Sequence, residues 1–286
     1  KMKTLGYYNG KYDEIENMVI PMNDRVCWFG DGVYDAGPAH NYKIYAVEEH
    51  IDRFFNSAGM LDIHIPMSKA DLKDLIQEMV NKMDSGDLFV YIQCTRGTDA
   101  KRNHIHEENE KGNLWITLTP AKVNYGLEPI TLSATKDTRF FHCNIKTLNL
   151  IPSVMAAQKS SREGTNECIF YRPGPYGGRV TECAHSNCHI IKDGKIITAP
   201  ADNLILPGIS RAHIIRMGKK LGIPVAEIPY TMDELMNADE VLISSSSNFV
   251  LRATKVAGQP VGGKAPELFE KLRKALTDEF KAATEN

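Results

Sequence analysis

The chain has 286 residues, of which 42% are hydrophobic and 24% are charged, and its formal net charge is −2. This length suffices for one large or two modest domains with a sizeable core, and the composition is that of an ordinary soluble globular protein. The near-neutral charge, without a long basic run, argues against binding to nucleic acid or to a membrane surface, and no apolar run approaches membrane-spanning length.

The cysteines and the first residues bear on the compartment. Six cysteines lie mostly in apolar stretches and lack the spacing of a small disulfide-rich scaffold, which favours a reduced, intracellular protein. Residues 1–10 lack the apolar core of a signal peptide. We therefore expect a cytoplasmic protein.

The first 120 residues predict a mixture of strands and helices. Asn9-Gly10, between two aromatic runs, is a strong signal for a type I′ hairpin turn, and Ser68 is suited to cap a helix. The stretch Phe29–Asp35, with two glycines, is interpreted as a tight turn, and Arg96–Gly112 as a polar loop. In chain order the predicted elements are a hairpin over Leu5–Ile15, helices over Ala46–Leu61 and Ala70–Met83, and strands over Leu88–Thr95 and Leu114–Thr119.

The remainder predicts a larger block of the same kind. Ser210 is expected to cap one helix and Gly222 to end it, and Thr231 with Glu234 forms a capping box for a short helix. The predicted strands cover Ile130–Thr135, Glu167–Tyr171, Arg179–Ala184, Cys188–Lys192, Lys195–Thr198 and Glu240–Ser244, and the helices cover Ile151–Arg162, Ser210–Leu221 and a last segment from Pro266.

The boundary between the blocks is predicted near residue 120. Periodicity lapses there, and Pro120, Gly126 and Pro129 punctuate the chain. We expect a small domain over 1–120, a linker over 121–129 and a larger domain over 130–286. Many strands and few helices in two unequal blocks indicate an α+β fold. No GxGxxG opens a helix after a strand, so a dinucleotide site is not indicated.

Lys146 is the candidate catalytic residue, because it lies in a short segment that is otherwise mostly uncharged. Its flanks Ile145 and Leu148 favour a partly apolar pocket. Burying an ammonium group is costly, so a desolvated lysine is more readily neutral and can then react with an aldehyde. The alternative is a surface lysine whose stem lies along the protein while its head reaches water.

Three segments resolve this choice by resemblance. Ile-Lys-Thr-Leu-Asn at 145–149, Val-Thr-Glu at 180–182 and Asn-Leu-Ile-Leu-Pro-Gly-Ile-Ser-Arg at 203–211 occur in the order and at the spacing of the fold type IV pyridoxal-phosphate aminotransferases. Within that family the chain is most similar to the D-amino-acid aminotransferases, and weaker similarity extends over nearly its whole length. The resemblance implies a two-domain fold type IV enzyme with pyridoxal 5′-phosphate in the cleft between the domains.

The resemblance also implies which residues hold the cofactor. Lys146 would bind its aldehyde, and Glu182 would keep the pyridine nitrogen protonated so that the ring withdraws electrons. Leu206 would pack against the ring. The remaining implied contacts are to the phosphate, from Arg53, Ile209, Ser210 and Ser246. Independently of the family, Gly208-Ile209-Ser210 precedes a predicted helix, and free N–H groups at a helix start suit an anion.

Substrate binding is implied by a second set of residues. In the D-amino-acid enzymes an Arg-x-His pair, lent by the partner subunit, joins a tyrosine around the substrate carboxylate; these match Arg102, His104 and Tyr34. The implied reaction is transamination between a D-amino acid such as D-alanine and a 2-oxo acid such as 2-oxoglutarate, by a homodimer. The alternatives within the fold are a branched-chain L-amino-acid aminotransferase and an aminodeoxychorismate lyase, and Arg102-x-His104 argues against both.

One segment departs from the family and raises a further alternative. After Thr-Glu the D-amino-acid enzymes carry small hydroxyl residues, whereas this chain has Cys183-Ala184-His185, which puts the substrate in question. The run Cys183, His185, Cys188, His189 superficially suggests a zinc-binding module. On a continuous strand Cys188 would face away from the other three, and the spacing matches no standard site, so we expect no metal. A catalytically silent cofactor-binding regulator is the other rival.

Overall fold

The structure is a computed structural model that describes residues 2–286; Lys1, the first residue of the predicted small domain, lies outside the described residues. The chain folds into two compact units. Of the described residues, unit 1 comprises 2–123, 145–149 and 281–286, and unit 2 comprises 124–144 and 150–280. The predicted domain limits stay a prediction.

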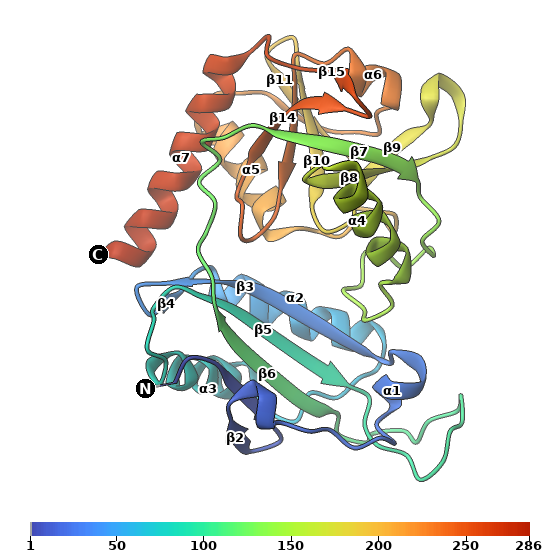
Figure 1. Ribbon diagram of the computed structural model, residues 1–286, viewed down its shortest axis with the longest axis vertical. Coiled ribbons are helices and arrows are strands. Elements are labelled where there is room, and N and C mark those ends of the chain that lie inside the picture. Colours follow the sequence, from blue (N-terminus) through green and yellow to red (C-terminus); the bar gives the residue numbers. More distant parts are fainter. Residues whose placement is uncertain (1) are drawn as a thin grey trace. The chain divides into compact units, whose positions relative to one another are not determined.

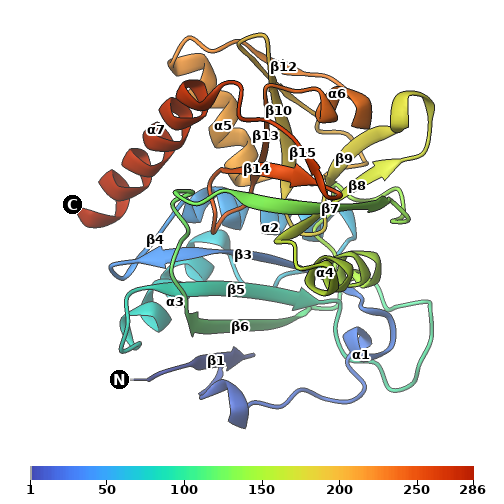
Figure 2. The ribbon, with the colours of Figure 1, turned by 45° about the horizontal axis from the view of Figure 1, so that its top comes forward.

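Unit 1 is built on an antiparallel sheet with strand order β2-β1-β6-β5-β3-β4 (Figure 1; Figure 2 shows β3, β5 and β6 side by side). Helix α2 packs against β3 and against α3, and buried side chains of the sheet and both helices form one core. Its strands are β1 (Leu5–Tyr8), β2 (Lys11–Asp13), β3 (Gly32–His40), β4 (Lys43–Ile44), β5 (Leu88–Thr95) and β6 (Asn113–Pro120), and its helices are η1 (Ile15–Asn17), α1 (Arg25–Phe29), α2 (Val47–Met60) and α3 (Lys69–Asn81).

The structure confirms most elements predicted for unit 1, and it also shows the local interactions on which those predictions were based. Asn9 and Gly10 both have positive φ, 45° and 92°, as a type I′ turn requires. The Ser68 side chain accepts a hydrogen bond from Asp71 N and caps α3.

Strand β3 was not predicted: the tight turn predicted over Phe29–Asp35 was wrong for Gly32–Asp35, which begin the strand, and the strand also contains Gly37 and Pro38. Both are accommodated locally. A Cβ at Gly37 would lie 2.7 Å from Nε2 of His50, so only glycine fits under that ring. On one side β3 pairs along its length with β5. On its other side it pairs with β4 only through Ala39 and His40, so the missing N–H of Pro38 interrupts no strand pairing there.

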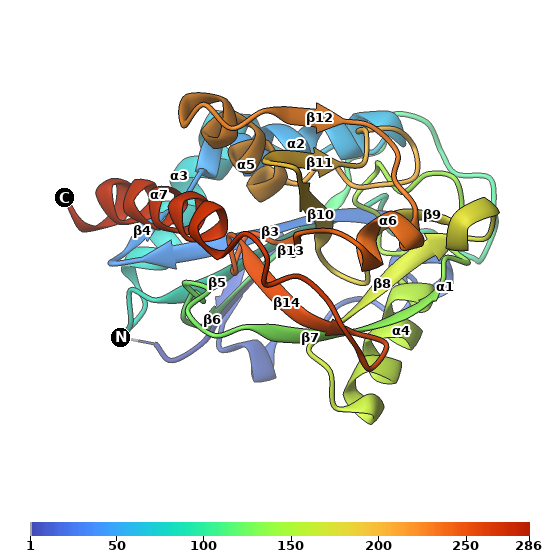
Figure 3. The same ribbon diagram turned by 90° about the horizontal axis from the view of Figure 1, so that it is seen from above.

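Unit 2 contains a mixed sheet with strand order β12-β11-β10-β13-β14-β7-β8-β9, and β15 pairs with β14 (Figure 3). Strand β7 runs parallel to both β8 and β14. The strands are β7 (Ile130–Lys136), β8 (Glu167–Arg172), β9 (Arg179–Cys183), β10 (Asn187–Lys192), β11 (Lys195–Thr198), β12 (Val225–Glu227), β13 (Glu240–Ser244), β14 (Leu251–Val256) and β15 (Gln259–Pro260), and the helices are α4 (Ile151–Glu163), η2 (Pro175–Gly177), α5 (Ile209–Lys220), α6 (Met232–Met236) and α7 (Pro266–Glu285). Of α7, residues 266–280 belong to unit 2 and the last five to unit 1.

The sheet of unit 2 curls around its core. Strand β9 leads through residues 184–186 directly into β10, although four strands separate them in the sheet order. Side chains from both strands, including Cys183 and Cys188, join the same buried cluster as those of β7, β13 and β14.

Two helix starts in unit 2 allow the predicted N-caps to be compared with the observed ones. Thr231 and Glu234 form the predicted capping box of α6. The predicted cap at Ser210 was wrong: α5 begins at Ile209, its N-cap is Gly208, and no side chain caps it.

Among residues 2–286, no helix combines the length and apolar character needed to cross a bilayer.

Candidate functional site

Lys146 lies in the segment 145–149, whose backbone is held beside β3 in unit 1. Tyr34 N donates to Lys146 O at 3.0 Å, and Leu148 N donates to Gly32 O at 3.1 Å. The side chains of Ile145 and Thr147 are buried, whereas Lys146 between them is half-buried. The alternation places the lysine on the other side of an anchored segment, so its position is set by its neighbours.

The amine of Lys146 lies against Tyr34. Its Nζ is 4.3 Å from the centroid of the Tyr34 ring, which stacks on Tyr91 with centroids 5.6 Å apart. The backbone N–H of Lys146 donates to Ser57 Oγ of α2 at 3.2 Å. Two residues predicted for different tasks, the cofactor lysine and the substrate tyrosine, are thus brought together.

Arg53 is buried in unit 1 and paired with Asp35. Its Nε and Nη2 donate to the two carboxylate oxygens of Asp35 at 2.7 and 2.8 Å, and Nδ1 of His50 lies 2.7 Å from Oδ1. Burial alone would raise the pKa of Asp35, but the charge and hydrogen bonds of Arg53, with those of His50, hold it well below its usual range. Arg53 is therefore a rigid buried cation, and not the solvent-facing arginine that its helix alone would suggest.

Arg102 and His104 share one aromatic support. The guanidinium carbon of Arg102 lies 4.7 Å from the centroid of the Phe29 ring, and the His104 ring lies 5.0 Å from it. Sequence reasoning placed Phe29 in a turn; it is the last residue of α1. Both predicted carboxylate-binding residues therefore lie at one ring of unit 1.

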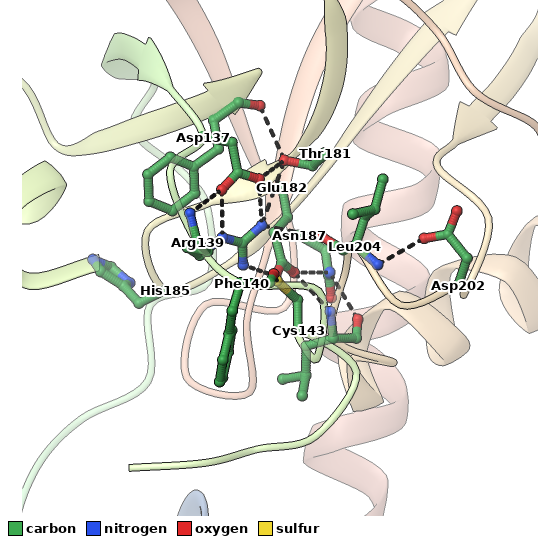
Figure 4. Close-up of polar contacts among 12 residues, drawn as sticks. Asp137, Arg139, Phe140, Cys143, Thr181, Glu182, His185, Asn187, Asp202 and Leu204 are labelled. Carbon is green, nitrogen blue, oxygen red and sulfur yellow. Dashed lines mark hydrogen bonds and ion pairs between the residues drawn. The ribbon is translucent and has the colours of Figure 1, made fainter. Parts of the chain in front are cut away.

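Glu182 is the centre of a buried polar network in unit 2 (Figure 4). Its Oε1 accepts from Nη1 of Arg139 at 2.5 Å. Its Oε2 accepts from Nδ2 of Asn187 at 2.8 Å and from the N–H of Leu206 at 3.1 Å. Three donors from separate segments orient this carboxylate, so it cannot rotate freely.

Arg139 and Asp137 belong to the same network and were missed by sequence reasoning. Nε and Nη2 of Arg139 donate to Asp137 at 3.0 and 2.9 Å, and Thr181 Oγ1 donates to Asp137 at 2.7 Å (Figure 4). Burial disfavours charge on Arg139, but the carboxylates of Glu182 and Asp137 together outweigh burial and raise the pKa of Arg139 above its usual value. The only sequence signal was two opposite charges directly after a strand, which does not reveal a partner more than 40 positions away.

Asn187 links Glu182 to the start of α5. Its Nδ2 also donates to Leu206 O at 3.0 Å, and a Cβ at Gly208 would lie only 2.0 Å from its Oδ1. Only glycine permits that approach. The predicted ring partner Glu182, the predicted ring support Leu206 and the first turn of α5 are consequently one connected structure.

The candidate phosphate-binding residues of unit 2 gather at the start of α5. Ile209 and Ser210 form its first turn, and Ser210 Oγ donates to Ser245 O at 2.7 Å, which joins the helix to the serine loop that contains Ser246. Behind the loop, the His189 ring lies between Thr198 Oγ1 and Ser244 Oγ, at 2.8 and 2.7 Å. An uncapped helix start beside a serine loop suits a phosphate group.

The run Cys183, His185, Cys188, His189 does not lie on one continuous strand, although a continuous strand was assumed when a zinc site was rejected from the sequence. Residues 184–186 turn the chain, and Cys183 and Cys188 both lie in the core. His189 is bonded as described above, whereas the His185 side chain is 61% exposed and its Nδ1 lies 3.0 Å from Oε2 of Glu167. Within residues 2–286, no group of three or more His, Cys, Asp or Glu is arranged to hold a metal ion.

Comparison with known proteins supplies the context for this geometry. The profile of the family "Amino-transferase class IV" matches residues 32–256. The D-alanine aminotransferase of Listeria monocytogenes serotype 1/2a (strain 10403S) is 37% identical over 282 residues, 96% of either chain. The D-alanine aminotransferase of Staphylococcus aureus (strain MSSA476) is 34% identical over 279 residues, 94% of this chain and 95% of its own.

Solved structures agree on the fold. The Escherichia coli branched-chain amino acid aminotransferase superimposes with a TM-score of 0.86 at 21% identity, over 100% of this chain and 97% of that chain. A fold IV transaminase from Curtobacterium pusillum gives 0.79 at 20% identity, over 93% and 92%. The α+β, fold type IV prediction is confirmed by these neighbours.

Proposed function

Since this chain belongs to the class IV aminotransferases and is itself an aminotransferase, we propose that its amino donors are D-amino acids such as D-alanine, and that its acceptor is a 2-oxo acid such as 2-oxoglutarate. The observation that carries this donor class is 34–37% identity to D-alanine aminotransferases over at least 94% of the chain. The solved branched-chain enzymes are less similar, at 20–23% identity, which supports a common fold and not a common substrate.

The residues present fit pyridoxal 5′-phosphate, the cofactor on which this family depends. When bound, the cofactor supplies an aldehyde that takes up amino groups and a ring that withdraws electrons from the α-carbon. Glu182 is a buried carboxylate with fixed orientation, as a partner for a protonated ring nitrogen must be. The uncapped first turn of α5, with Ser210 and the serine loop, offers N–H and hydroxyl donors to a phosphate.

Each candidate residue then has a defined task. Lys146 would hold the aldehyde and, once the substrate amine displaces it, take the proton from the substrate α-carbon at Nζ. Glu182 would bind the ring nitrogen and Leu206 would pack on the ring. The residues proposed to hold the phosphate are Arg53, Ile209, Ser210 and Ser246.

The carboxylate-binding residues would set the stereochemistry. Arg102 can make a bidentate contact to a carboxylate, and His104 and Tyr34 can add hydrogen bonds. Because Lys146 removes the proton from one face only, the position of the carboxylate decides which enantiomer presents its hydrogen to Nζ. We propose that Arg102 and His104 act in the site of the second subunit of a homodimer.

Steady-state turnover tests the donor class. With 2-oxoglutarate as acceptor, we expect D-alanine to be converted to pyruvate with a kcat/KM at least a hundredfold above that for L-leucine. A preference for L-leucine would favour the branched-chain activity instead. Release of pyruvate from aminodeoxychorismate without a 2-oxo acid would identify the lyase.

A further inference from the structure

Arg25 is a buried arginine that neither the sequence motifs nor the proposed chemistry uses. It opens α1, directly after Asp24, whose side chain accepts from Val26 N and caps the helix. The Arg25 side chain is only 4% exposed. Its Nε lies 2.8 Å from Oδ2 of Asp31, which also receives Nε of Arg96 at 2.8 Å.

The rest of the Arg25 guanidinium binds the loop that carries Arg102 and His104. Nη1 donates to Asp99 Oδ2 at 2.5 Å and to the backbone oxygen of Asn103 at 2.7 Å. Nη2 donates to the backbone oxygen of His104 at 3.1 Å. One side chain thus holds two consecutive backbone carbonyl groups of this loop, those of residues 103 and 104.

The same helix supports the two loop side chains. Phe29, four residues after Arg25, contacts Arg102 and His104 through its ring, and the Arg25 guanidinium carbon lies 4.9 Å from the centroid of that ring. Arg25 therefore meets the loop by hydrogen bonds to its backbone, and Phe29 meets it through the side chains. A guanidinium on an aromatic face is held by both stacking and electrostatic attraction.

We propose that Arg25, with Phe29, positions Arg102 and His104 for the substrate carboxylate, so that it sets the affinity for amino acids without touching them. This rests on the proposed function of Arg102 and His104. Removing the guanidinium releases the backbone oxygens of residues 103 and 104 from the group that holds them, and a displacement of about 1 Å in a group that positions the substrate can lower kcat/KM by up to about a hundredfold.

A purely structural role predicts a different pattern. Loss of any buried arginine lowers stability, but only a positioning residue raises KM for a carboxylate substrate through Arg102. Arg96 supplies the matched control: it shares Asp31 with Arg25, yet its other bonds go to the backbone oxygens of Leu61 and Asp62.

The experiment compares Arg25→Gln, Phe29→Leu and Arg96→Gln in the holoenzyme, alone and combined with Arg102→Ala. We expect Arg25→Gln and Phe29→Leu to raise KM for D-alanine about tenfold or more with little change in kcat or in pyridoxal-phosphate affinity. We expect Arg96→Gln to leave KM unchanged. In the Arg102→Ala background, Arg25→Gln should raise KM for D-alanine by less than about threefold, because both changes remove the same interaction with the carboxylate.

Phe29→Leu keeps the test decisive if Arg25→Gln does not fold, because it leaves no buried carboxylate without its arginine. An equal KM increase in Arg96→Gln, or a full multiplicative effect of Arg25→Gln or Phe29→Leu in the Arg102→Ala background, would overturn the positioning role while leaving the function intact. If Arg102→Ala itself does not change KM, the proposed carboxylate site fails, and the positioning role fails with it.

Discussion

Replacing Glu182 by Gln separates the charge of the carboxylate from its shape. In the parent protein two oxygens accept three donors, from Arg139, Asn187 and Leu206. Glutamine has one oxygen and one NH₂ group in the same positions. Whichever way the amide is oriented, an NH₂ group faces either the Arg139 guanidinium or the Asn187 and Leu206 donors.

This geometry sets the expected losses in the free energy of unfolding and in the reaction rate. One charge-assisted hydrogen bond is worth about 1.5–3 kcal/mol, so the free energy of unfolding should fall by about that amount. For the reaction, losing one preorganised electrostatic contact costs about 2.7–4 kcal/mol, which corresponds to about a hundred- to a thousandfold in rate. We therefore expect a moderately destabilised enzyme that still binds the cofactor but reacts far more slowly.

Glu240→Gln is the control for stability. Glu240 is fully buried in the same unit, and its two oxygens accept from the N–H groups of Gly263 and Ala265 at 3.0 and 3.1 Å. Urea denaturation should show similar losses for both variants, whereas single-turnover absorbance with D-alanine should be slow only in Glu182→Gln. A Glu182→Gln enzyme as fast as Glu240→Gln at equal cofactor occupancy would refute the role of the carboxylate.

Three other outcomes are expected. Borohydride reduction of the loaded protein should fix the cofactor to the peptide containing Lys146, and labelling of another lysine would exclude this assignment. Arg102→Ala should raise KM for D-alanine about ten- to a hundredfold, through one charged contact, and spare amines without a carboxylate; unchanged kinetics would contradict it. His189, buried between Thr198 and Ser244, has its pKa lowered by burial to about 3, so the unfolded chain protonates first. Below about pH 6.5 stability should therefore fall by up to about 1.4 kcal/mol per pH unit, and His189→Gln should show a shallower decline in urea denaturation between pH 6.5 and 4; parallel curves would refute this.

Local signals accounted for much of the fold. The Asn9-Gly10 turn, the Ser68 cap and the Thr231 capping box each depend on residues close in sequence, and each was predicted correctly. Strand β3 was missed because the acceptability of Gly37 depends on His50 of α2, a tertiary contact. Ser210 has the right chemistry for a cap, but its hydroxyl bonds to Ser245 O instead.

The same distinction applies to the candidate site. The segments around Lys146 and Glu182 were recognised as motifs, whereas their supports were not. Arg139 reaches Glu182 across 43 positions, and Arg25 reaches the backbone of His104 across 79. Neither partnership has a local signature, since an isolated arginine in a sequence is most often a surface residue.

We propose above that the enzyme transfers amino groups from D-amino acids through Lys146 and pyridoxal phosphate. The most direct measurement adds D-alanine, and separately L-alanine, to the purified holoenzyme without an oxo acid and follows the visible absorbance of the cofactor. We expect that D-alanine bleaches this absorbance and releases one pyruvate per subunit, that 2-oxoglutarate restores it, and that L-alanine leaves it unchanged. Bleaching by L-alanine in preference to D-alanine would refute the D-amino-acid donor class, and bleaching by neither enantiomer would refute alanine as an amino donor.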